Sequence, residues 1–373
     1  MLKILTAPSR YIQGYDVIKN AGKHISKLGS RPFIMGGNRA LATIKDKISA
    51  TMKENNQEFL ITPFNGKGTR TDAENLVTLA SDFKADVVVG AGGGLAIDTA
   101  KAVAYETGLP LTIIPTIAST DAPCSSASLQ YTEDHRIDRV LFMKRNPDLV
   151  IVDTRIIAEA PTRFFVAGMG DALSTWFEAH TCQGTGVRNL AGGMPTATGI
   201  TIARLTYDTL MKYGVSAKKA VDQNAVTPAV EMVIEANCLL SSMGFENCGL
   251  GAAHSFGVGL SALKGTEDML HGELVGFGTI ANLVIENYSA EETHRVIEFC
   301  ASVGLPVTLK ELGIEDRSRD NIMKAARASA DGEGTHMANL AFDVTHEMIV
   351  DSIIMADKIG EEYLKKSTGK RRK

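Results

Sequence analysis

The sequence of 373 residues has few cysteines, little net charge and no long apolar run, and each shortage excludes a class of protein. Its five cysteines are irregularly spaced and never form Cys-x-x-Cys, so neither a disulfide framework nor a zinc–thiolate cluster is indicated. The first residues contain no signal-peptide core or cleavage site, and no apolar window is long enough to span a bilayer. We therefore expect a cytoplasmic protein with reduced thiols.

The net charge of −4 at pH 7 gives no general attraction to nucleic acid or to anionic lipid. We therefore expect neither a nucleic-acid partner nor a membrane. The basic run from Lys365 to Lys373 is expected to be a solvated tail. A hydrophobic fraction of 44% and a charged fraction of 22% are typical of globular proteins, and the length predicts two domains.

The first part of the chain alternates short apolar runs with helical patterns. Continuous β-branched runs of this kind are typical of strands buried on both faces, as in a parallel sheet, and their alternation with helices predicts an α/β domain. The predicted strands are residues 32–35, 59–61, 87–89, 111–114 and 149–152. After Asp153 the patterns are helical, and Pro161 interrupts the chain near the change. We predict an α/β domain at residues 1–157 and an all-α domain at residues 158–373.

A glycine cluster, Gly90-Ala91-Gly92-Gly93-Gly94, joins the third predicted strand directly to a helix. Glycines let backbone N–H groups approach a ligand, and a helix N-terminus attracts phosphate. The spacing matches neither the P-loop nor a clean Gly-x-Gly-x-x-Gly, so a tight turn without a ligand remains the alternative. Asp98 is expected to act as a first-turn partner of the helix dipole rather than as a catalytic acid.

A second polar loop, residues 115–126, follows the next strand and carries the hydroxyls of Thr116, Ser119 and Ser125. Ligands of open α/β sheets bind at the carboxyl ends of the strands, so these hydroxyls could hold a ribose, a phosphate or a nicotinamide amide. Asp121 is the carboxylate of this loop. A role in binding and a role as a turn residue before Pro123 are both open.

Three residues of the helical half could bind a metal: Asp171, His254 and His271. Two imidazoles and a carboxylate suit a divalent cation and leave a position for substrate. The wide spacing leaves simpler roles open, with Asp171 as a helix N-cap, His254 as a core histidine and His271 as a helix-start residue. Glu273 is an alternative ligand or a residue that orients His271. Competing histidines elsewhere in this half are His180, His294, His336 and His346.

These stretches resemble the glycerol dehydrogenases, within the group III, iron-containing type alcohol dehydrogenases. The resemblance covers nearly the whole chain. It is carried by the glycine cluster through Lys101, by the loop 115–125, by Gly168–Ala179, and by Gly249–His254 with His271-Gly272-Glu273. It implies a dehydroquinate synthase-like architecture: an N-terminal dinucleotide domain, a C-terminal helical domain and a cleft between them.

The resemblance also implies ligands. It implies Zn²⁺, with Fe²⁺ as the alternative, on Asp171, His254 and His271, and Asp121 near a substrate hydroxyl. It implies hydride transfer between glycerol or a related diol and NAD, with NADP as the alternative, in a homo-oligomer such as an octamer. The residues expected at the dinucleotide are Gly37, Gly92, Gly93, Gly94, Leu95, Asp98, Thr116, Ser119, Ser125, Leu129 and Tyr131.

The sequence departs from that pattern at three positions. Gly37, followed by Asn38 and Arg39, stands where relatives carry an Asp that would bind the adenosine ribose, which puts the preference for NAD in doubt. Leu95 stands where glycerol dehydrogenases often have Lys, and Gly257 where some relatives have a further His.

Other functions compete with this interpretation. A glycerol-1-phosphate dehydrogenase and an NADP-preferring hydroxyketone or aldehyde reductase are the closest alternatives. A cyclising lyase of the dehydroquinate synthase kind needs several cations, whereas the metal-site segments offer chiefly Lys264 and Arg188. A nucleotide sensor would not need the three metal ligands.

Overall fold

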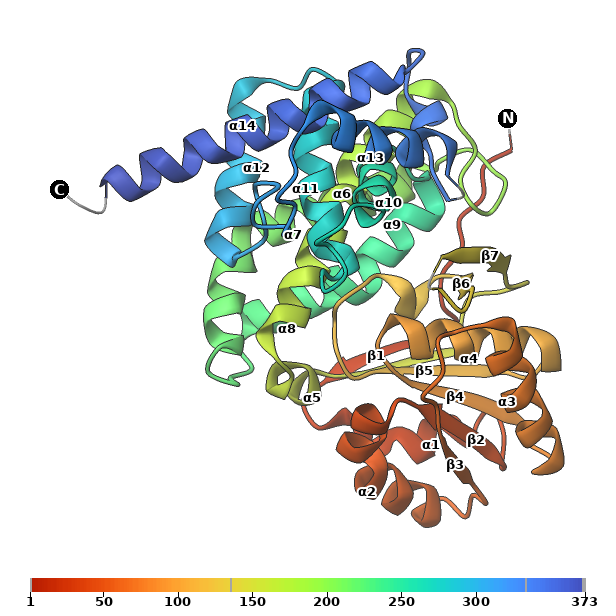
Figure 1. Cartoon of the computed structure of the whole chain (residues 1–373). Coiled ribbons are helices and arrows are strands. Elements are labelled where there is room, and N and C mark those ends of the chain that lie inside the picture. Colours follow the sequence, from red (N-terminus) through yellow and green to blue (C-terminus); the bar gives the residue numbers. More distant parts are fainter. Residues whose placement is uncertain (1, 135, 333, 371–373) are drawn as a thin grey trace. The chain divides into compact units, whose positions relative to one another are not determined.

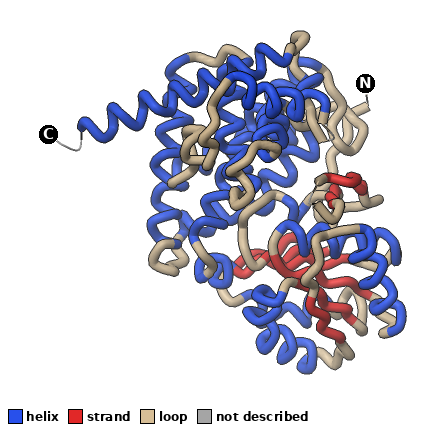
Figure 2. The backbone as a smooth tube through the Cα atoms, viewed as in Figure 1, coloured by secondary structure: helices blue, strands red, loops and turns tan. Residues whose placement is uncertain are grey.

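The computed structural model describes residues 2–134, 136–332 and 334–370, which form two compact units. The sheet unit comprises residues 6–165 and 219–243, and the helical unit comprises the described residues of 1–5, 166–218 and 244–373. Figure 2 shows most strands gathered in one sheet and the helical unit built of helices and loops. The segment 219–243 packs with the sheet unit, although it follows the predicted boundary at residue 157 by many residues.

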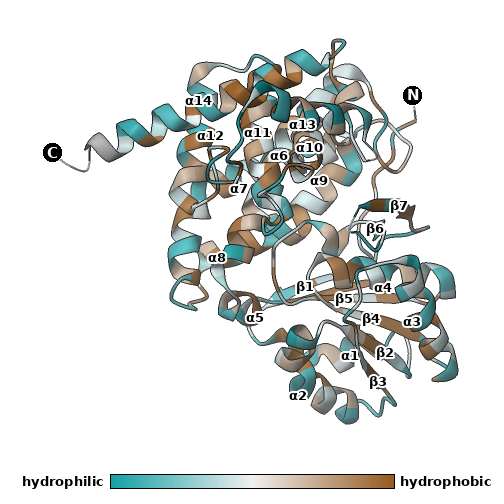
Figure 3. Ribbon diagram, viewed as in Figure 1, coloured by the Kyte–Doolittle hydropathy of each residue, from teal (hydrophilic) through white to brown (hydrophobic). Residues whose placement is uncertain are grey.

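The sheet unit is built on six parallel strands in the order β1-β8-β5-β4-β2-β3. The α/β fold class and the parallel sheet expected from the apolar runs are therefore confirmed. The strand bounds are β1 Tyr11–Gly14, β2 Pro32–Gly36, β3 Leu60–Pro63, β4 Val87–Gly92, β5 Leu111–Pro115 and β8 Leu149–Asp153. Figure 3 shows strongly hydrophobic colours along the central strands, as burial on both faces requires.

Helices cover both faces of this sheet (Figure 1). On one face Val87 and Val89 of β4 belong to the same buried core as Ile44 and Ile48 of α2. On the other face a Cβ at Gly90 would lie 2.3 Å from the Cβ of Ala100 in α4, so the glycine lets that helix approach the strand. The helices are α1 Ala21–Ile25, α2 Asn38–Glu54, α3 Arg70–Asp82, α4 Gly94–Thr107, α5 Thr154–Glu159 and α8 Pro228–Glu235, with a π-helix at Ala236–Leu240.

Sequence patterns missed three strands. β1 is a short edge strand of mixed polarity that pairs with β8. β6 Ala127–Tyr131 and β7 Ile137–Phe142 form a separate antiparallel pair after the second polar loop. Along β7 exposed side chains alternate with half-buried or buried ones, which makes a weaker signal than a continuous apolar run.

The helical unit confirms the all-α character predicted for the second half. Its main helices are α6 Thr162–Thr185, α7 Ala197–Val221, α9 Ser241–Cys248, α10 Ala252–Ser261, α11 His271–Ile285, α12 Ala290–Val303, α13 Arg319–Asp331 and α14 His346–Lys370. Residues 365–370 continue α14, and the side chains of Lys365 and Lys366 are 76% exposed, so this part of the basic run is helical and these two lysines face solvent; residues 371–373 lie outside the described residues. Among the described helices, none combines the length and apolarity needed to cross a bilayer.

Candidate metal centre and dinucleotide-binding residues

Glycines bring three helices of the helical unit close together. A Cβ at Gly170 of α6 would lie 2.1 Å from the backbone oxygen of Gly272 in α11, and a Cβ at Gly278 would lie 2.4 Å from the backbone oxygen of Ala253 in α10. No larger residue fits these contacts without moving a helix. Gly170 precedes Asp171, Gly272 follows His271 and Ala253 precedes His254, so the close approach of the backbones brings those three side chains together.

The ligand atoms of Asp171, His254 and His271 all lie within 4.8 Å of one another. Asp171 Oδ1 is 3.4 Å from Nε2 of His254 and 3.4 Å from Nε2 of His271. Ligand atoms bonded at about 2.0 to 2.2 Å to one tetrahedral cation lie about 3.4 Å apart. Both the donor set and these distances therefore fit a divalent cation such as Zn²⁺ or Fe²⁺.

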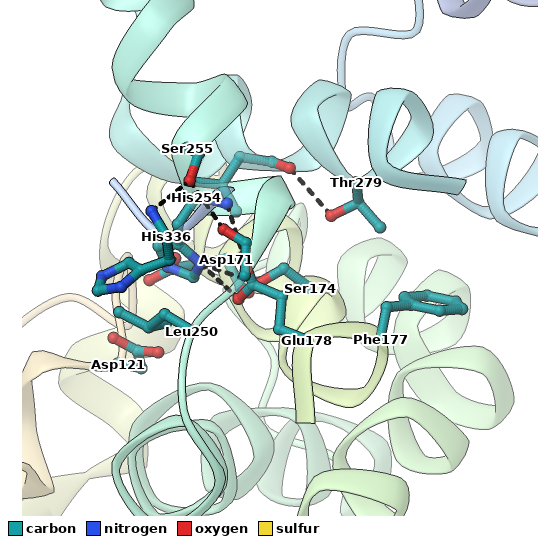
Figure 4. A network of polar contacts seen from close by, with 12 residues as sticks. Asp121, Asp171, Ser174, Phe177, Glu178, Leu250, His254, Ser255, Thr279 and His336 are labelled. Atoms are coloured by element: carbon teal, nitrogen blue, oxygen red, sulfur yellow. Dashed lines mark hydrogen bonds and ion pairs between the residues drawn. The ribbon is translucent and has the colours of Figure 1, made fainter. Parts of the chain in front are cut away.

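Glu178 fixes the orientation of His254 (Figure 4). Its carboxylate accepts a hydrogen bond from the backbone N–H of His254 at 2.9 Å and lies 2.7 Å from Nδ1 of the same residue. A proton on Nδ1 directed at the carboxylate leaves the lone pair of Nε2 on the side of Asp171. Asp171 and Glu178 are seven residues apart on α6, two helical turns, so one face of that helix carries both carboxylates.

The pKa values of His254 and Asp171 are shifted by the close pairing of carboxylates and imidazoles in this buried cluster. Burial disfavours charge on the His254 imidazole, but the Glu178 and Asp171 carboxylates outweigh burial and raise its pKa well above the ordinary value. Burial opposes ionisation of Asp171, but His271 and His254 hold its pKa far below the ordinary value. The site therefore stabilises a cation, whether a proton or a metal ion.

The members of the cluster differ in their exposure to solvent. The His271 side chain is 48% exposed, whereas Asp171 and Glu178 are buried. The cluster is therefore exposed to solvent at His271.

Two alternatives considered from sequence are wrong, namely Asp171 as a helix N-cap and Glu273 as a ligand in its place. Asp171 lies inside α6, which begins at Thr162, and so is not an N-cap. Glu273 accepts a hydrogen bond from the backbone N–H of Leu270, at the start of α11, and lies outside the cluster of ligand atoms. His271 is indeed the first residue of α11, but its ring joins the cluster.

The competing histidines have other surroundings. His180 stacks on Trp176, His294 contacts the ring of Tyr363, and His346 pairs with Asp331. His336 is half-buried, its backbone N–H donates to Ser255, and burial lowers the pKa of its ring. Figure 4 draws His336 in the same polar network as His254. Sequence reasoning gave no signal that would rank His336 above the others.

In the sheet unit the glycine cluster forms the end of β4 and the start of α4. Gly92 has φ +145°, a conformation that favours glycine, and Gly93 is the residue before the helix. A Cβ at Gly93 would lie 2.7 Å from Ile117, and one at Gly94 would lie 3.3 Å from Thr120. The second polar loop therefore lies against the start of α4, and the turn presents helix N–H groups beside the loop hydroxyls.

The second loop is held from two sides within the sheet unit. Lys101 of α4 donates hydrogen bonds to the backbone oxygens of Ala122 and Ala127 and to Ser125 Oγ. From the π-helix and the start of α9, Asn237 donates to the backbone oxygen of Ala118 and Ser241 donates to Asp121 Oδ2 at 2.9 Å. π-Helical turns occur frequently at functional sites. Neither Lys101 nor Ser241 was assigned a role from sequence.

The remaining predicted dinucleotide residues have varied surroundings. Asp98 lies beyond the first turn of α4, is nearly buried and is 3.5 Å from Lys101 Nζ, which corrects its expected dipole role.

Thr116 and Ser119 are nearly buried, and Leu129 and Tyr131 lie half-buried on β6. Burial and the nearby Asp98 raise the pKa of Tyr131. Gly37 precedes α2, and Leu95 is an exposed residue that lies against Gly68.

Comparison with known proteins agrees with these observations. Residues 8–154 match the model of the iron-containing alcohol dehydrogenase family. A glycerol dehydrogenase from Citrobacter freundii is 41% identical over 365 residues, which cover 98% of this chain and 100% of that protein. A glycolaldehyde reductase from Halobacterium salinarum is 41% identical over 360 residues, which cover 96% and 98%.

A solved structure described as a probable glycerol dehydrogenase from Sinorhizobium meliloti superposes with a TM-score of 0.91 at 38% identity. The match covers 96% of this chain and 99% of that one. The chain therefore belongs to the iron-containing alcohol dehydrogenase family, in the group of the glycerol dehydrogenases, and is a metal-dependent oxidoreductase.

Proposed function

We propose that this chain catalyses hydride transfer between a small vicinal diol, with glycerol as the first substrate to test, and a nicotinamide dinucleotide. The observation that carries the proposal is the convergence of the ligand atoms of Asp171, His254 and His271 on one point, with the His271 side chain exposed. The relatives named for glycerol support the choice of substrate.

We propose that Asp171, His254 and His271 hold Zn²⁺, with Fe²⁺ as the alternative, because both ions accept two imidazoles and a carboxylate. When bound, the cation lowers the pKa of an alcohol hydroxyl and so favours hydride loss from its carbon. Glu178 keeps Nε2 of His254 available as a ligand. Ser241 fixes the rotamer of Asp121, the proposed partner of a substrate hydroxyl.

Dinucleotide binding is assigned to residues 1–157 and metal binding to residues 158–373. The glycine turn of Gly92, Gly93 and Gly94 supports the first assignment, because unpaired N–H groups at a helix start bind phosphate. The proposed residues around it are Gly37, Leu95, Asp98, Thr116, Ser119, Ser125, Leu129 and Tyr131.

We propose that the chain accepts NADP as well as NAD, and that Gly37 is the deciding position. A Cβ there would meet no atom within 4 Å, so the residue leaves room for a 2′-phosphate. The first turn of α2 carries no acidic residue, and Arg39 supplies a cation. Measured kcat/KM values for NAD and NADP test this proposal; a strong preference for NAD would contradict it.

A second candidate is reduction of a small hydroxyaldehyde. The relative named glycolaldehyde reductase is as similar to this chain as the C. freundii glycerol dehydrogenase, and the same centre would polarise a carbonyl. Comparison of kcat/KM for glycerol oxidation, dihydroxyacetone reduction and glycolaldehyde reduction distinguishes the two candidates.

Replacement of a proposed ligand tests the central claim. We expect His254→Ala to lose bound metal and turnover while the purified protein keeps its circular-dichroism spectrum. His346→Ala is the matched control, because that side chain is 37% exposed and pairs with Asp331, away from the cluster of ligand atoms. Metal content and turnover in His254→Ala equal to those of the control would overturn the assignment.

Two further proposals rest on the resemblance to the glycerol dehydrogenases: that the protein is a homo-oligomer, such as an octamer, and that it is cytoplasmic. Light scattering on the purified protein measures the first. Fractionation of the native cells measures the second.

A further inference from the structure

We infer that Lys101 is a positioning residue whose ammonium shapes the loop after β5 so that the loop can bind a nicotinamide dinucleotide, an inference that rests on the proposed function. Lys101 lies on α4, seven residues after the last glycine of the turn. Its hydrogen bonds go to the loop after β5 and to the first residue of β6, so its role would be exerted through the loop.

The contacts of Lys101 match the capacity of an ammonium group. Nζ lies 2.7 Å from the backbone oxygen of Ala122, 3.1 Å from Ser125 Oγ and 2.6 Å from the backbone oxygen of Ala127. An ammonium has three N–H donors, and each has an acceptor here. The side chain is fully buried. A long, charged side chain is rarely buried to this extent unless it is paired.

The counter-charge comes from the same helix. Asp98 Oδ1 lies 3.5 Å from Nζ, one helical turn before Lys101, and is itself nearly buried. The backbone oxygen of Asp98 also accepts a hydrogen bond from Ser128 in β6. Asp98 and Lys101 therefore fasten α4 to the loop and to the strand that follows it.

The chain curls around the ammonium between Ala122 and Ala127. Asp121 directly precedes this turn, Ser125 lies within it, and Leu129 and Tyr131 follow on β6. All four belong to the residues proposed for substrate or dinucleotide. One ammonium thus sets the path of the backbone that carries them.

The opposite side of the loop has separate attachments. Asn237 holds the backbone oxygen of Ala118, and Ser241 holds Asp121. Loss of Lys101 is therefore expected to displace the 122–127 turn and leave the rest of the loop attached. A methyl or amide group in place of the ammonium cannot donate to all three acceptors.

The test compares Lys101→Met with the wild-type holoenzyme and with Lys45→Met, which removes an exposed lysine from α2. Binding of NADH and NADPH is measured by nucleotide fluorescence, together with KM for the dinucleotide, KM for glycerol and metal content. We expect Kd and KM for the dinucleotide to rise about tenfold or more in Lys101→Met, as loss of charged hydrogen bonds implies, with metal content unchanged. Lys45→Met should match the wild type.

A purely structural role gives a different result: a lower melting temperature and a smaller active fraction, with dinucleotide Kd unchanged. That result would overturn the inference. If Lys101→Met does not fold, Lys101→Gln, which keeps part of the donor capacity, is judged by the same Kd criterion. Failure of the wild type to bind either dinucleotide would overturn the proposed function as well, whereas an unchanged Kd in the variants would overturn only the role of Lys101.

Discussion

At the scale of single residues, the candidate metal centre depends on a carboxylate that is not a ligand. Glu178 is buried and receives two N–H groups of one residue, the backbone N–H and Nδ1 of His254. Both of its oxygens therefore act as acceptors in a place that water does not reach. Such a residue sets the tautomer and rotation of the ligand it contacts.

Glu178→Gln should weaken metal binding although it barely changes the volume of the side chain. The amide NH₂ of the new side chain would face one of the two N–H groups of His254, so two donors would meet without an acceptor. A buried polar group left unsatisfied in this way costs about 1–3 kcal/mol. We expect metal affinity to fall about 10- to 100-fold, as for comparable changes around metal-bound histidines. Competition with a chromogenic chelator measures the affinity.

The control for this change is Glu291→Gln on α12, where the carboxylate is 83% exposed and pairs with Arg295. Equal metal affinities in the two variants would mean that Glu178 does not orient His254.

Gly37→Asp should shift the dinucleotide preference towards NAD. The position has φ −62° and ψ 151°, which any residue adopts, and there is space for the side chain. A carboxylate there would bind the free 2′-hydroxyl and repel a 2′-phosphate. We expect the ratio of kcat/KM for NAD to that for NADP to rise about tenfold or more, which corresponds to about 1.4 kcal/mol.

The same variant has an internal check. Asp is a better N-cap than Gly by a few tenths of a kcal/mol, so the variant should melt at or slightly above the temperature of the wild type. An unchanged ratio of kcat/KM values in this stable protein would remove Gly37 from the dinucleotide site.

At the scale of elements, the centre exists because helices approach closely where they carry glycine. α6 and α11 touch through backbone atoms at Gly170 and Gly272. Leu305 also packs against Gly170, so the contact has no spare volume. Asp171 follows the first glycine and His271 precedes the second, which couples the spacing of the ligands to the packing of the helices.

Gly170→Ala should therefore damage both stability and metal binding. The added Cβ would lie 2.1 Å from the backbone oxygen of Gly272, which forces the helices apart. Overpacking of this kind costs about 1–3 kcal/mol. We expect a lower melting temperature and weaker metal affinity, measured by calorimetry and chelator competition.

Gly184→Ala is the matched control on the same helix. Its Cβ would meet no atom within 4 Å, and replacement of a helical glycine by alanine stabilises by about 0.5–1 kcal/mol. If both variants were stabilised alike, the close approach at Gly170 would not be what spaces the ligands.

At the scale of the whole molecule, the two units have different tasks in the proposed function. All three proposed metal ligands lie in the helical unit, whereas the glycine turn and both attachments of the second loop lie in the sheet unit. Bound metal should therefore stabilise the helical unit directly, because a ligand that binds only the folded state adds to its stability.

Removal of metal should increase hydrogen exchange in α6, α10 and α11. At a free metal concentration of about a thousand times Kd, binding contributes about 4 kcal/mol. Hydrogen exchange followed by mass spectrometry, with and without chelator, measures the protection of peptides from each helix. Equal protection of these helices with and without metal would contradict the proposed centre.

The sequence by itself determined the central strands, the helical character of the second half and the family. Continuous β-branched runs specified the central strands because strands buried on both faces have no polar side to display. The glycine cluster, the loop 115–125 and the stretches that contain Asp171, His254 and His271 were specific enough to indicate the family by resemblance. The short edge strand β1 and the β6–β7 pair were missed, because β1 is short and of mixed polarity and the alternation along β7 is a weaker signal than a continuous apolar run.

Only the tertiary structure decided which of these residues act together. Asp171 was taken from sequence to start a helix, but it lies inside α6, where the same face presents Glu178. Glu178 accepts from His254, which is 76 residues away in the chain, and Ser241 donates to Asp121, which is 120 residues away. The loop acceptors of Lys101 are 21 to 26 residues away. Local periodicity carries no information about contacts at such separations, because they depend on how close helices and loops can pack.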